Sequence, residues 1–219
     1  MKKFDNKKIG LTPKELKELR RLNTPRKIQD FVTTMPQNFE PDGETCMSAR
    51  EVLAKRRSHC IEGATLAALA FWVNGRRPLL MDLKTEDDDD HVVAIFKENG
   101  CWGAVSKTNH AILRYRDPVY CTLRELAMSY FHEYSNNKWK KSLRSYSRPL
   151  DLSTYEPKVW ATGKDAWVIA EDVDAIRHFP LVTRKQARNL RKLEKVEQKA
   201  GSILQYERPT SRKKSRRSR

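Results

Sequence analysis

Residues 60–73, CIEGATLAALAFWV, are the most apolar stretch of a chain that is otherwise polar and basic. Glu62 is the one charged residue in this stretch, and residues 56–59 directly before it, RRSH, are polar or cationic. A segment of this length that is apolar on every side predicts a helix buried in the core. Cys60 would then stand in the first turn of the helix, where the helix dipole and the neighbouring cations stabilise a thiolate. The sequence therefore favours Cys60 as a nucleophile, the alternative being a small buried hydrophobic residue.

The positive charge is concentrated at the C-terminal end. The chain has 219 residues and a net charge of +16, and residues 184–219 hold 14 basic and 3 acidic residues, which is +11 of that total. The length fits one well-buried domain with extensions. A basic segment of this kind binds polyanions, so we expect nucleic acid or another polyanion as a partner of residues 184–219.

The cysteines and the apolar runs indicate in which compartment of the cell the protein is found. The four cysteines, at positions 46, 60, 101 and 121, form no CxxC pair and have no zinc-finger spacing. The start of the chain, MKKFDNKK, lacks the apolar segment of a secretory signal. The longest uninterrupted apolar run, residues 67–73, is far shorter than the roughly 20 residues of a membrane span. We therefore expect a cytoplasmic protein with reduced thiols, no membrane contact and no cofactor.

Local signals predict an α+β fold. Capping-box patterns begin at Thr12, Ser48, Thr122 and Thr183, and Thr24-Pro25 adds a further helix start. We expect helices near residues 13–22, 25–34, 49–56, 60–73, 123–134 and 184–200. We expect strands at residues 78–83, 91–96 and 101–105, and a further hairpin over residues 160–170. The predicted architecture is a central buried helix packed on an antiparallel sheet, with peripheral helices.

Four regions follow from this pattern. Residues 1–35 form an N-terminal helical arm, residues 36–180 the core with its C-terminal extension, and residues 181–200 a basic helix. Residues 201–219 contain little that could pack, so we expect a disordered basic tail.

The hairpin between the second and third strands predicts which side chains lie together. If Asn99-Gly100 is a two-residue turn, each pair of facing positions sums to 199, and Val93 faces Ser106. Since side chains alternate between the two faces, Ser106 lies diagonally across from His91, close enough to orient its ring. Asn109 points to the opposite face unless a bulge intervenes. A thiol nucleophile and an imidazole base are the minimum for cysteine acyl-transfer chemistry, so we expect His91 to serve Cys60 as base.

Three pieces of the sequence carry a resemblance to a known family. These are SHCIEGATLAALAFWVNG, DDDHVVAIF and GCWGAVSKTN, all between residues 48 and 109. A cysteine opening a central helix, a histidine opening a strand, and Gly-x-Trp before a short strand are similar to the transglutaminase-like superfamily. The pieces RYRDP, RELAMSYFHEY and LRSYSRPLDL also resemble a bacterial subgroup of it. The resemblance implies a papain-like arrangement, in which the cysteine forms a thioester with an acyl group.

The orienting residue departs from that family. Counting from Trp102, the place where the superfamily usually has an aspartate is held by Ser106. A serine can fix the tautomer of the ring, but it supplies no negative charge. Asn109, through a bulge, and Asp90, beside His91, are the alternative orienting residues.

The resemblance leaves two functions open. One is a peptidase, amidase or acyltransferase acting on a peptide or amide through Cys60, His91 and Ser106. The other is a catalytically weakened fold that serves as a binding protein, with its basic C-terminus contacting nucleic acid. The acidic run at residues 86–90 is interpreted as a solvated loop rather than a metal site.

Overall fold

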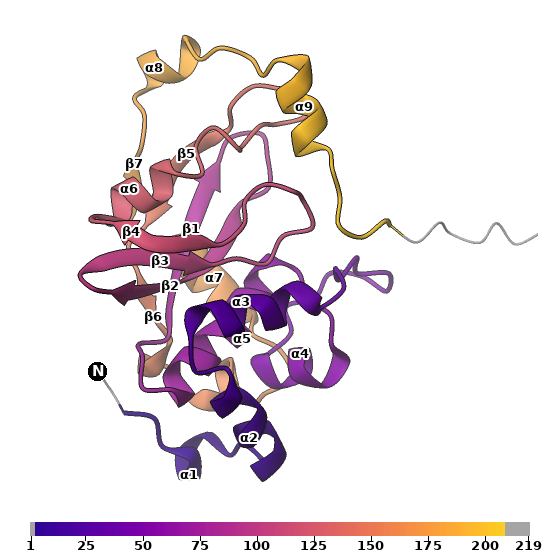
Figure 1. Ribbon diagram of the computed structural model, residues 1–219, viewed down its shortest axis with the longest axis vertical. Coiled ribbons are helices and arrows are strands. Elements are labelled where there is room, and N and C mark those ends of the chain that lie inside the picture. Colours follow the sequence, from indigo (N-terminus) through magenta and orange to yellow (C-terminus); the bar gives the residue numbers. More distant parts are fainter. Residues whose placement is uncertain (1–2, 209–219) are drawn as a thin grey trace, which may run out of the picture.

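A seven-stranded antiparallel sheet forms the centre of the protein, as the computed structural model, which describes residues 3–208, shows (Figure 1). The strands are β1 (Leu79–Thr85), β2 (His91–Glu98), β3 (Cys101–Val105), β4 (Arg116–Tyr120), β5 (Leu143–Ser147), β6 (Leu150–Asp151) and β7 (His178–Pro180). Their order is β4-β3-β2-β1-β5-β7, and the short β6 also pairs with β1. β2, which begins at His91, thus lies between β1 and β3, and Ser106 directly follows β3.

Helices surround the sheet. They are α1 (Asn6–Ile9), α2 (Pro13–Arg21), α3 (Pro25–Thr34), α4 (Ala49–Lys55), α5 (Cys60–Val73), α6 (Leu123–Met128), α7 (Trp167–Ala175), α8 (Arg184–Arg188) and α9 (Lys195–Gly201). Of these, α2, α3, α4, α6 and α8 begin where the capping signals predict. Two 3₁₀ turns, η1 (Leu152–Thr154) and η2 (Pro157–Val159), lie before α7. Thr12, Thr122 and Thr183 each make both hydrogen bonds of a capping box, and Ser48 and Thr24 accept from a backbone N–H in the first turn. None of the helices within residues 3–208 is long and apolar enough to cross a membrane.

The predicted central helix is α5, and it is buried along its length. Every residue from position 61 to position 72 is buried, Glu62 included. The helix packs against β2 and is covered by α2, α3 and α4 (Figure 1). A Cβ at Gly63 would lie 2.5 Å from the Cβ of Lys107, so this glycine lets the segment after β3 approach the first turns of α5. That approach brings Ser106 toward the end of the helix that carries Cys60.

The β2–β3 hairpin confirms the predicted register. The paired residues run from Glu98 with Cys101 to Ala94 with Val105, and each pair sums to 199. Asn99 and Gly100 both have positive φ, 48° and 83°, as a two-residue turn of this kind requires. Alternation then divides the sheet into two faces. One face packs on α5 through Leu80, Val92, Ala94, Phe96 and Val105, and the other packs on α6 through Met81, Val93, Ile95 and Ala104.

Three helix and strand predictions differ from the structure. The hairpin predicted for residues 160–170 is wrong: α7 begins at Trp167, because Ile169 and Val173, four residues apart, both bury on one helical face. The helix expected over residues 123–134 ends at Met128 and continues as separate turns. The basic helix expected over residues 184–200 is divided into α8 and α9, because the N–H of Leu193 between them bonds to the carbonyl of Trp139 instead.

The segment after α9 is ordered where we expected disorder. Leu204 pairs with His110 in an isolated bridge, and the N–H groups of Gln205 and Tyr206 bond to the backbone and side chain of Asn109. Backbone pairing with an exposed loop holds this segment, although it has few apolar residues to bury. The rest of the predicted tail, residues 209–219, lies outside the described residues.

Candidate active site

Cys60 lies at the floor of an open cleft. It is the first residue of α5, it is half-buried, and it lines a cleft of about 680 Å³ together with His91. The walls come from the acidic loop before β2, the segment after β3, residues 133–139 and the end of α9. The structure therefore brings the predicted nucleophile and base together, at a place that a substrate can reach.

Ser106 is the residue that orients His91. Its Oγ lies 2.8 Å from Nε2 of the ring, and its hydroxyl donates to the carbonyl of Leu113. Since a serine has one O–H and Leu113 takes it, the oxygen can only accept from the ring. Nε2 of His91 therefore carries the proton, and Nδ1 is the nitrogen left for the hydrogen bond that the ring makes with the Cys60 thiol. This is the tautomer that a base for Cys60 needs.

The position of Ser106 is fixed on both sides. The side chain of Gln29, from α3, accepts from the Ser106 N–H and donates to the Ser106 carbonyl, each over 2.9 Å. Leu113 has a φ of 60°, a left-handed conformation that is costly for leucine, and its N–H donates to Glu133 over 2.7 Å. Glu133 in turn pairs with Arg116 at 2.7 Å. These contacts aim the Leu113 carbonyl at the hydroxyl and so decide which way the serine donates.

The two alternative orienting residues are engaged elsewhere. Asn109 exchanges two hydrogen bonds of 2.9 Å with the backbone of Tyr206. Asp90 accepts from the N–H of Thr85 over 2.6 Å. Of the three residues considered from the sequence, Ser106 alone makes a hydrogen bond to the His91 ring among those the structure describes.

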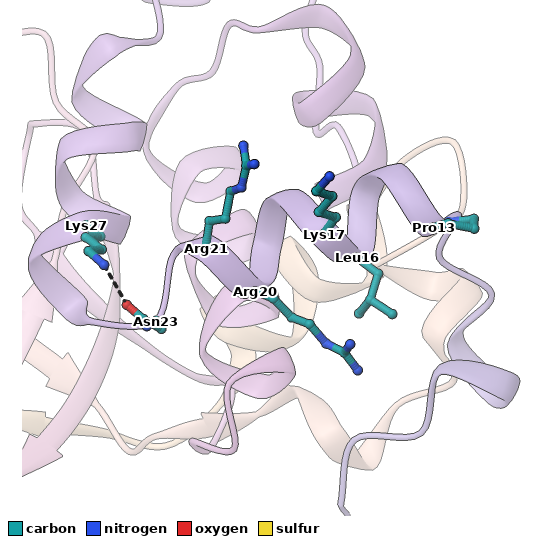
Figure 2. Close-up of a pocket in the computed structure, with 7 residues that line it drawn as sticks. All are labelled: Pro13, Leu16, Lys17, Arg20, Arg21, Asn23 and Lys27. Carbon is teal, nitrogen blue, oxygen red and sulfur yellow. Dashed lines mark hydrogen bonds between the residues drawn. The ribbon is translucent and has the colours of Figure 1, made fainter.

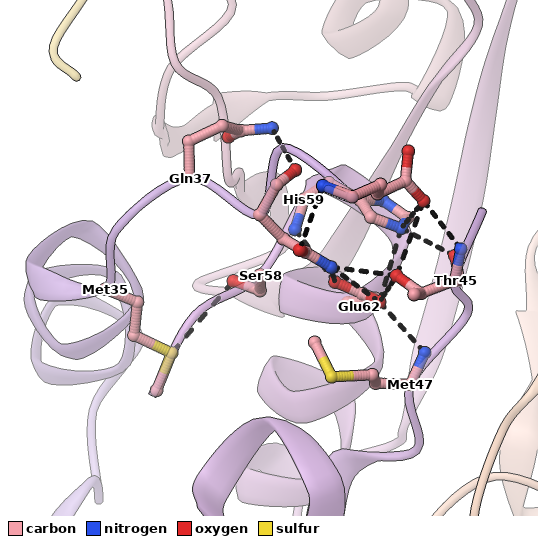
Figure 3. Close-up of polar contacts among 9 residues, drawn as sticks. Met35, Gln37, Thr45, Met47, Ser58, His59 and Glu62 are labelled. Carbon is pink, nitrogen blue, oxygen red and sulfur yellow. Dashed lines mark hydrogen bonds and ion pairs between the residues drawn. The ribbon is translucent and has the colours of Figure 1, made fainter. Parts of the chain in front are cut away.

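A second histidine, His59, stands beside Cys60 and is paired with a buried carboxylate (Figure 3). Its Nε2 donates to the carbonyl of Thr45 over 2.9 Å and lies 3.3 Å from Oε1 of Glu62. The Glu62 carboxylate is fully buried and accepts from the N–H groups of His59 and Met47, the hydroxyl of Thr45 and the amide of Asn38, over 2.8–3.1 Å. Four donors and an imidazole thus satisfy the one acidic group of α5.

This arrangement makes Cys60 an acidic thiol. Burial by itself would raise the pKa of Cys60, but hydrogen bonds from His59 and His91 and the positive charges of both rings lower it to about 5. Burial would lower the pKa of His59, yet its bonds to Cys60 and Glu62 raise it to about 11. Burial would raise the pKa of Glu62, and His59 lowers it to about 2. At neutral pH the site therefore holds a thiolate, an imidazolium and a carboxylate in contact.

The other cysteines contrast with Cys60. Burial and the charge of Glu62 raise the pKa of the Cys46 thiol to about 12. The neighbouring thiol of Cys101 raises the pKa of the exposed Cys121. A reactive cysteine needs a lowered pKa together with access to solvent, and Cys60 combines the two.

Two further polar groups line the cleft without partners. The hydroxyl of Tyr134 and Oε1 of Gln37 are buried and make no hydrogen bond within the described part of the chain. Burial and the charge of Cys60 raise the pKa of Tyr134 well above its usual value, so its hydroxyl keeps its proton. A buried polar atom without a partner is costly, so these two atoms need an explanation beyond packing.

Sequence reasoning missed several of these residues. His59 was grouped with the cations before Cys60, although a histidine three residues before Glu62 has the spacing of a helix-capping pair. Gln29, which binds the Ser106 backbone, and Tyr134, which lines the cleft, come from distant parts of the chain, and no local spacing marks them.

A second hollow lies over α2 and the start of α3 and shares no lining residue with the cleft at Cys60 (Figure 2). Its volume is about 700 Å³, and its lining includes four cations, Lys17, Arg20, Arg21 and Lys27, of which Lys27 bonds to Asn23. It holds no acidic group and no nucleophile. It can attract an anion but cannot perform catalysis of the kind that Cys60 supports.

Comparison with known proteins assigns no family to the chain. No protein-family model matches it, and no curated protein matches it. The α+β class is confirmed by the helices and the antiparallel sheet, but this class hosts many unrelated functions. Function must therefore be inferred from the residues of the site.

Proposed function

We propose that this protein is a transglutaminase-like cysteine enzyme that cleaves or exchanges an amide bond. The supporting observation is the chain of contacts from Cys60 through His91 to Ser106, in which the serine leaves Nδ1 of the ring facing the thiol. The papain-like placement of the cysteine at the start of α5 and the histidine at the start of β2 agrees with this proposal.

The reaction proceeds through a thioester. Nδ1 of His91 takes the proton of the Cys60 thiol, and the thiolate attacks the carbonyl carbon of the amide. The ring then returns this proton from Nδ1 to the leaving amine as the C–N bond breaks. Water or a second amine then attacks the thioester, and the same nitrogen takes up its proton. The products are a carboxylic acid in the first case, as in a peptidase or amidase, and a new amide in the second, as in an acyltransferase.

We expect two donors to bind the oxyanion that forms during the attack. The N–H of Cys60 belongs to the first turn of α5, where backbone N–H groups have no partner within the helix. The hydroxyl of Tyr134 lines the same cleft and has no partner in the described structure. Donors that already point at the developing charge are among the largest contributions to catalysis.

Ser106 directs the His91 ring without supplying the negative charge of an aspartate. The thiolate gains a second stabilising group, the His59 imidazolium, whose own charge Glu62 compensates. Formation of the thiolate therefore depends on His59 as well as His91, and direction of the proton depends on Ser106.

Acylation by an activated ester tests the proposal. Mixing the protein with p-nitrophenyl acetate should release one equivalent of nitrophenolate in a burst and leave an acetyl group on Cys60, found by mass spectrometry of peptides. Cys60→Ala should show no burst, and Cys46→Ala should behave as the parent protein. Acetylation spread over several cysteines, or a burst that survives in Cys60→Ala, would contradict the proposal.

A second function, binding of a polyanion, is favoured by the basic hollow on α2 and α3 (Figure 2). Four cations line it, and residues 184–219 add a net charge of +11. Phosphate contacts of this kind give an affinity that falls steeply with salt. Fluorescence anisotropy with a single-stranded oligonucleotide should show binding that weakens in Arg20→Gln/Arg21→Gln and on deletion of residues 201–219. If both variants bind the oligonucleotide as tightly as the parent protein does, this function is excluded.

A further inference from the structure

Three aspartates converge between the central strand β1, the loop before β2 and α7. Asp82 is on β1, Asp90 is in the loop before β2, and Asp174 is on α7. One carboxylate oxygen of each lies within 4.8 Å of the others. Asp82 is 2% exposed, and the other two are open to solvent, so the cluster has a buried floor and an accessible side.

Each of the three carboxylates is held by one of its oxygens. Oδ2 of Asp82 lies 3.0 Å from Nε2 of His178, Oδ1 of Asp90 accepts from Thr85, and Oδ1 of Asp174 accepts from Lys84. These contacts orient the groups and leave the second oxygen of each available.

The buried carboxylate has an oxygen without a partner. Oδ1 of Asp82 is buried and makes no hydrogen bond to any residue between positions 3 and 208. Removing a charged oxygen from water without giving it a partner is costly, so such an atom indicates a missing ligand. Asp82 is also the most buried of the three aspartates, so it forms the floor of the cluster.

The charges around the cluster do not balance. Three carboxylates meet one lysine, Lys84, whose side chain is 37% exposed and so is free to move aside. His178 also faces the cluster, with Nε2 3.0 Å from Oδ2 of Asp82. Carboxylates that lie this close repel one another when they are ionised, and a divalent cation would offset this repulsion.

We propose that Asp82, Asp90 and Asp174 bind a hard divalent cation. Such ions prefer carboxylate oxygens, and metal–oxygen bonds of about 2.3–2.6 Å can join oxygens that lie within 4.8 Å of one another. Water would complete the coordination on the exposed side. Since Asp90 directly precedes His91, the ion would also hold the loop that forms one wall of the cleft. This site does not depend on the proposed reaction of Cys60.

Titration of the full chain with Mn²⁺, followed by the electron paramagnetic resonance signal of the free ion, tests the proposal. One ion should bind per chain and be displaced by Ca²⁺ or Mg²⁺. Asp174→Asn, at an exposed position, should weaken binding by about tenfold or more, as should Asp82→Asn. Lys84→Gln should tighten binding, because it removes the competing cation. Asp87→Asn, in the same loop but outside the cluster, is the matched control and should bind as the parent does.

Several results would overturn the proposal. If neither the parent nor Lys84→Gln binds Mn²⁺, then the three aspartates do not form a cation site. Equal affinities of Asp174→Asn and the parent would place the ion elsewhere. A loss in Asp87→Asn as large as that in Asp174→Asn would indicate non-specific attraction to an acidic loop. All of these are binding measurements, so an inactive Cys60 would not affect them.

Discussion

Replacement of Ser106 by alanine isolates the role of the serine in directing the proton. The change removes the acceptor of the bond from Nε2 of His91 and the donor to the carbonyl of Leu113, and Ser106 is only 1% exposed, so water cannot easily replace it. Leaving a buried polar group unpaired costs about 1–3 kcal/mol. If that loss falls on the orientation and tautomer of the ring, acylation should slow by about 5-fold to 150-fold.

Two assays on the same variant separate the direction of the proton by His91 from the activation of the Cys60 thiol. Acylation by p-nitrophenyl acetate, in stopped flow, needs both the thiolate and the correctly oriented ring. Alkylation by iodoacetamide needs only the thiolate, which His59 also stabilises, so it should change less. Ser106→Thr keeps the hydroxyl and should restore part of the rate, and Ser153→Ala removes a buried serine outside the cleft and should have no effect. If Ser106→Ala acylates at the parental rate, or if both assays fall equally, the serine does not direct His91.

Three further changes test other parts of the site. Glu62 has a pKa of about 2 instead of 4.5, so its charge stabilises the fold by about 3 kcal/mol above pH 4.5, and this is lost as the pH falls through about 2. Glu62→Gln should lower the free energy of unfolding in urea at pH 7 by that order; an unchanged value would refute the ion pair with His59. Tyr134→Phe should slow acylation by about 100-fold at unchanged stability, because the hydroxyl has no partner to lose in the described structure; parental kinetics would remove it from the oxyanion site. Gln29→Ala removes the two hydrogen bonds to the backbone of Ser106 and should slow acylation by about fivefold. A parental rate would show that these two hydrogen bonds are not needed to position Ser106.

The sequence predicted those parts of the site that follow from local pattern. The apolar run of α5 placed Cys60 at a helix start, and the Asn99-Gly100 turn with strict alternation placed Ser106 near His91. Both predictions depend on short-range geometry, in which a turn or a helical period leaves few alternatives.

Contacts made between distant segments could not be predicted in this way. The polar Thr-Gly-Lys-Asp stretch before α7 has the composition of a hairpin turn, but it docks on Cys46 and Met47 through Ala166 and Asp165, and the helix begins behind it. Residues after α9 are held by pairing with the loop at Asn109, which no property of their own sequence reveals.

The absorbance of the thiolate near 240 nm, followed as a function of pH, tests the activation of Cys60 most directly. The difference between the parent protein and Cys60→Ala gives the titration of this one thiol. The contacts with His59 and His91 predict a midpoint near pH 5. A midpoint near 9, the ordinary value for a cysteine, would contradict the account, because no activated nucleophile would then exist in the cleft.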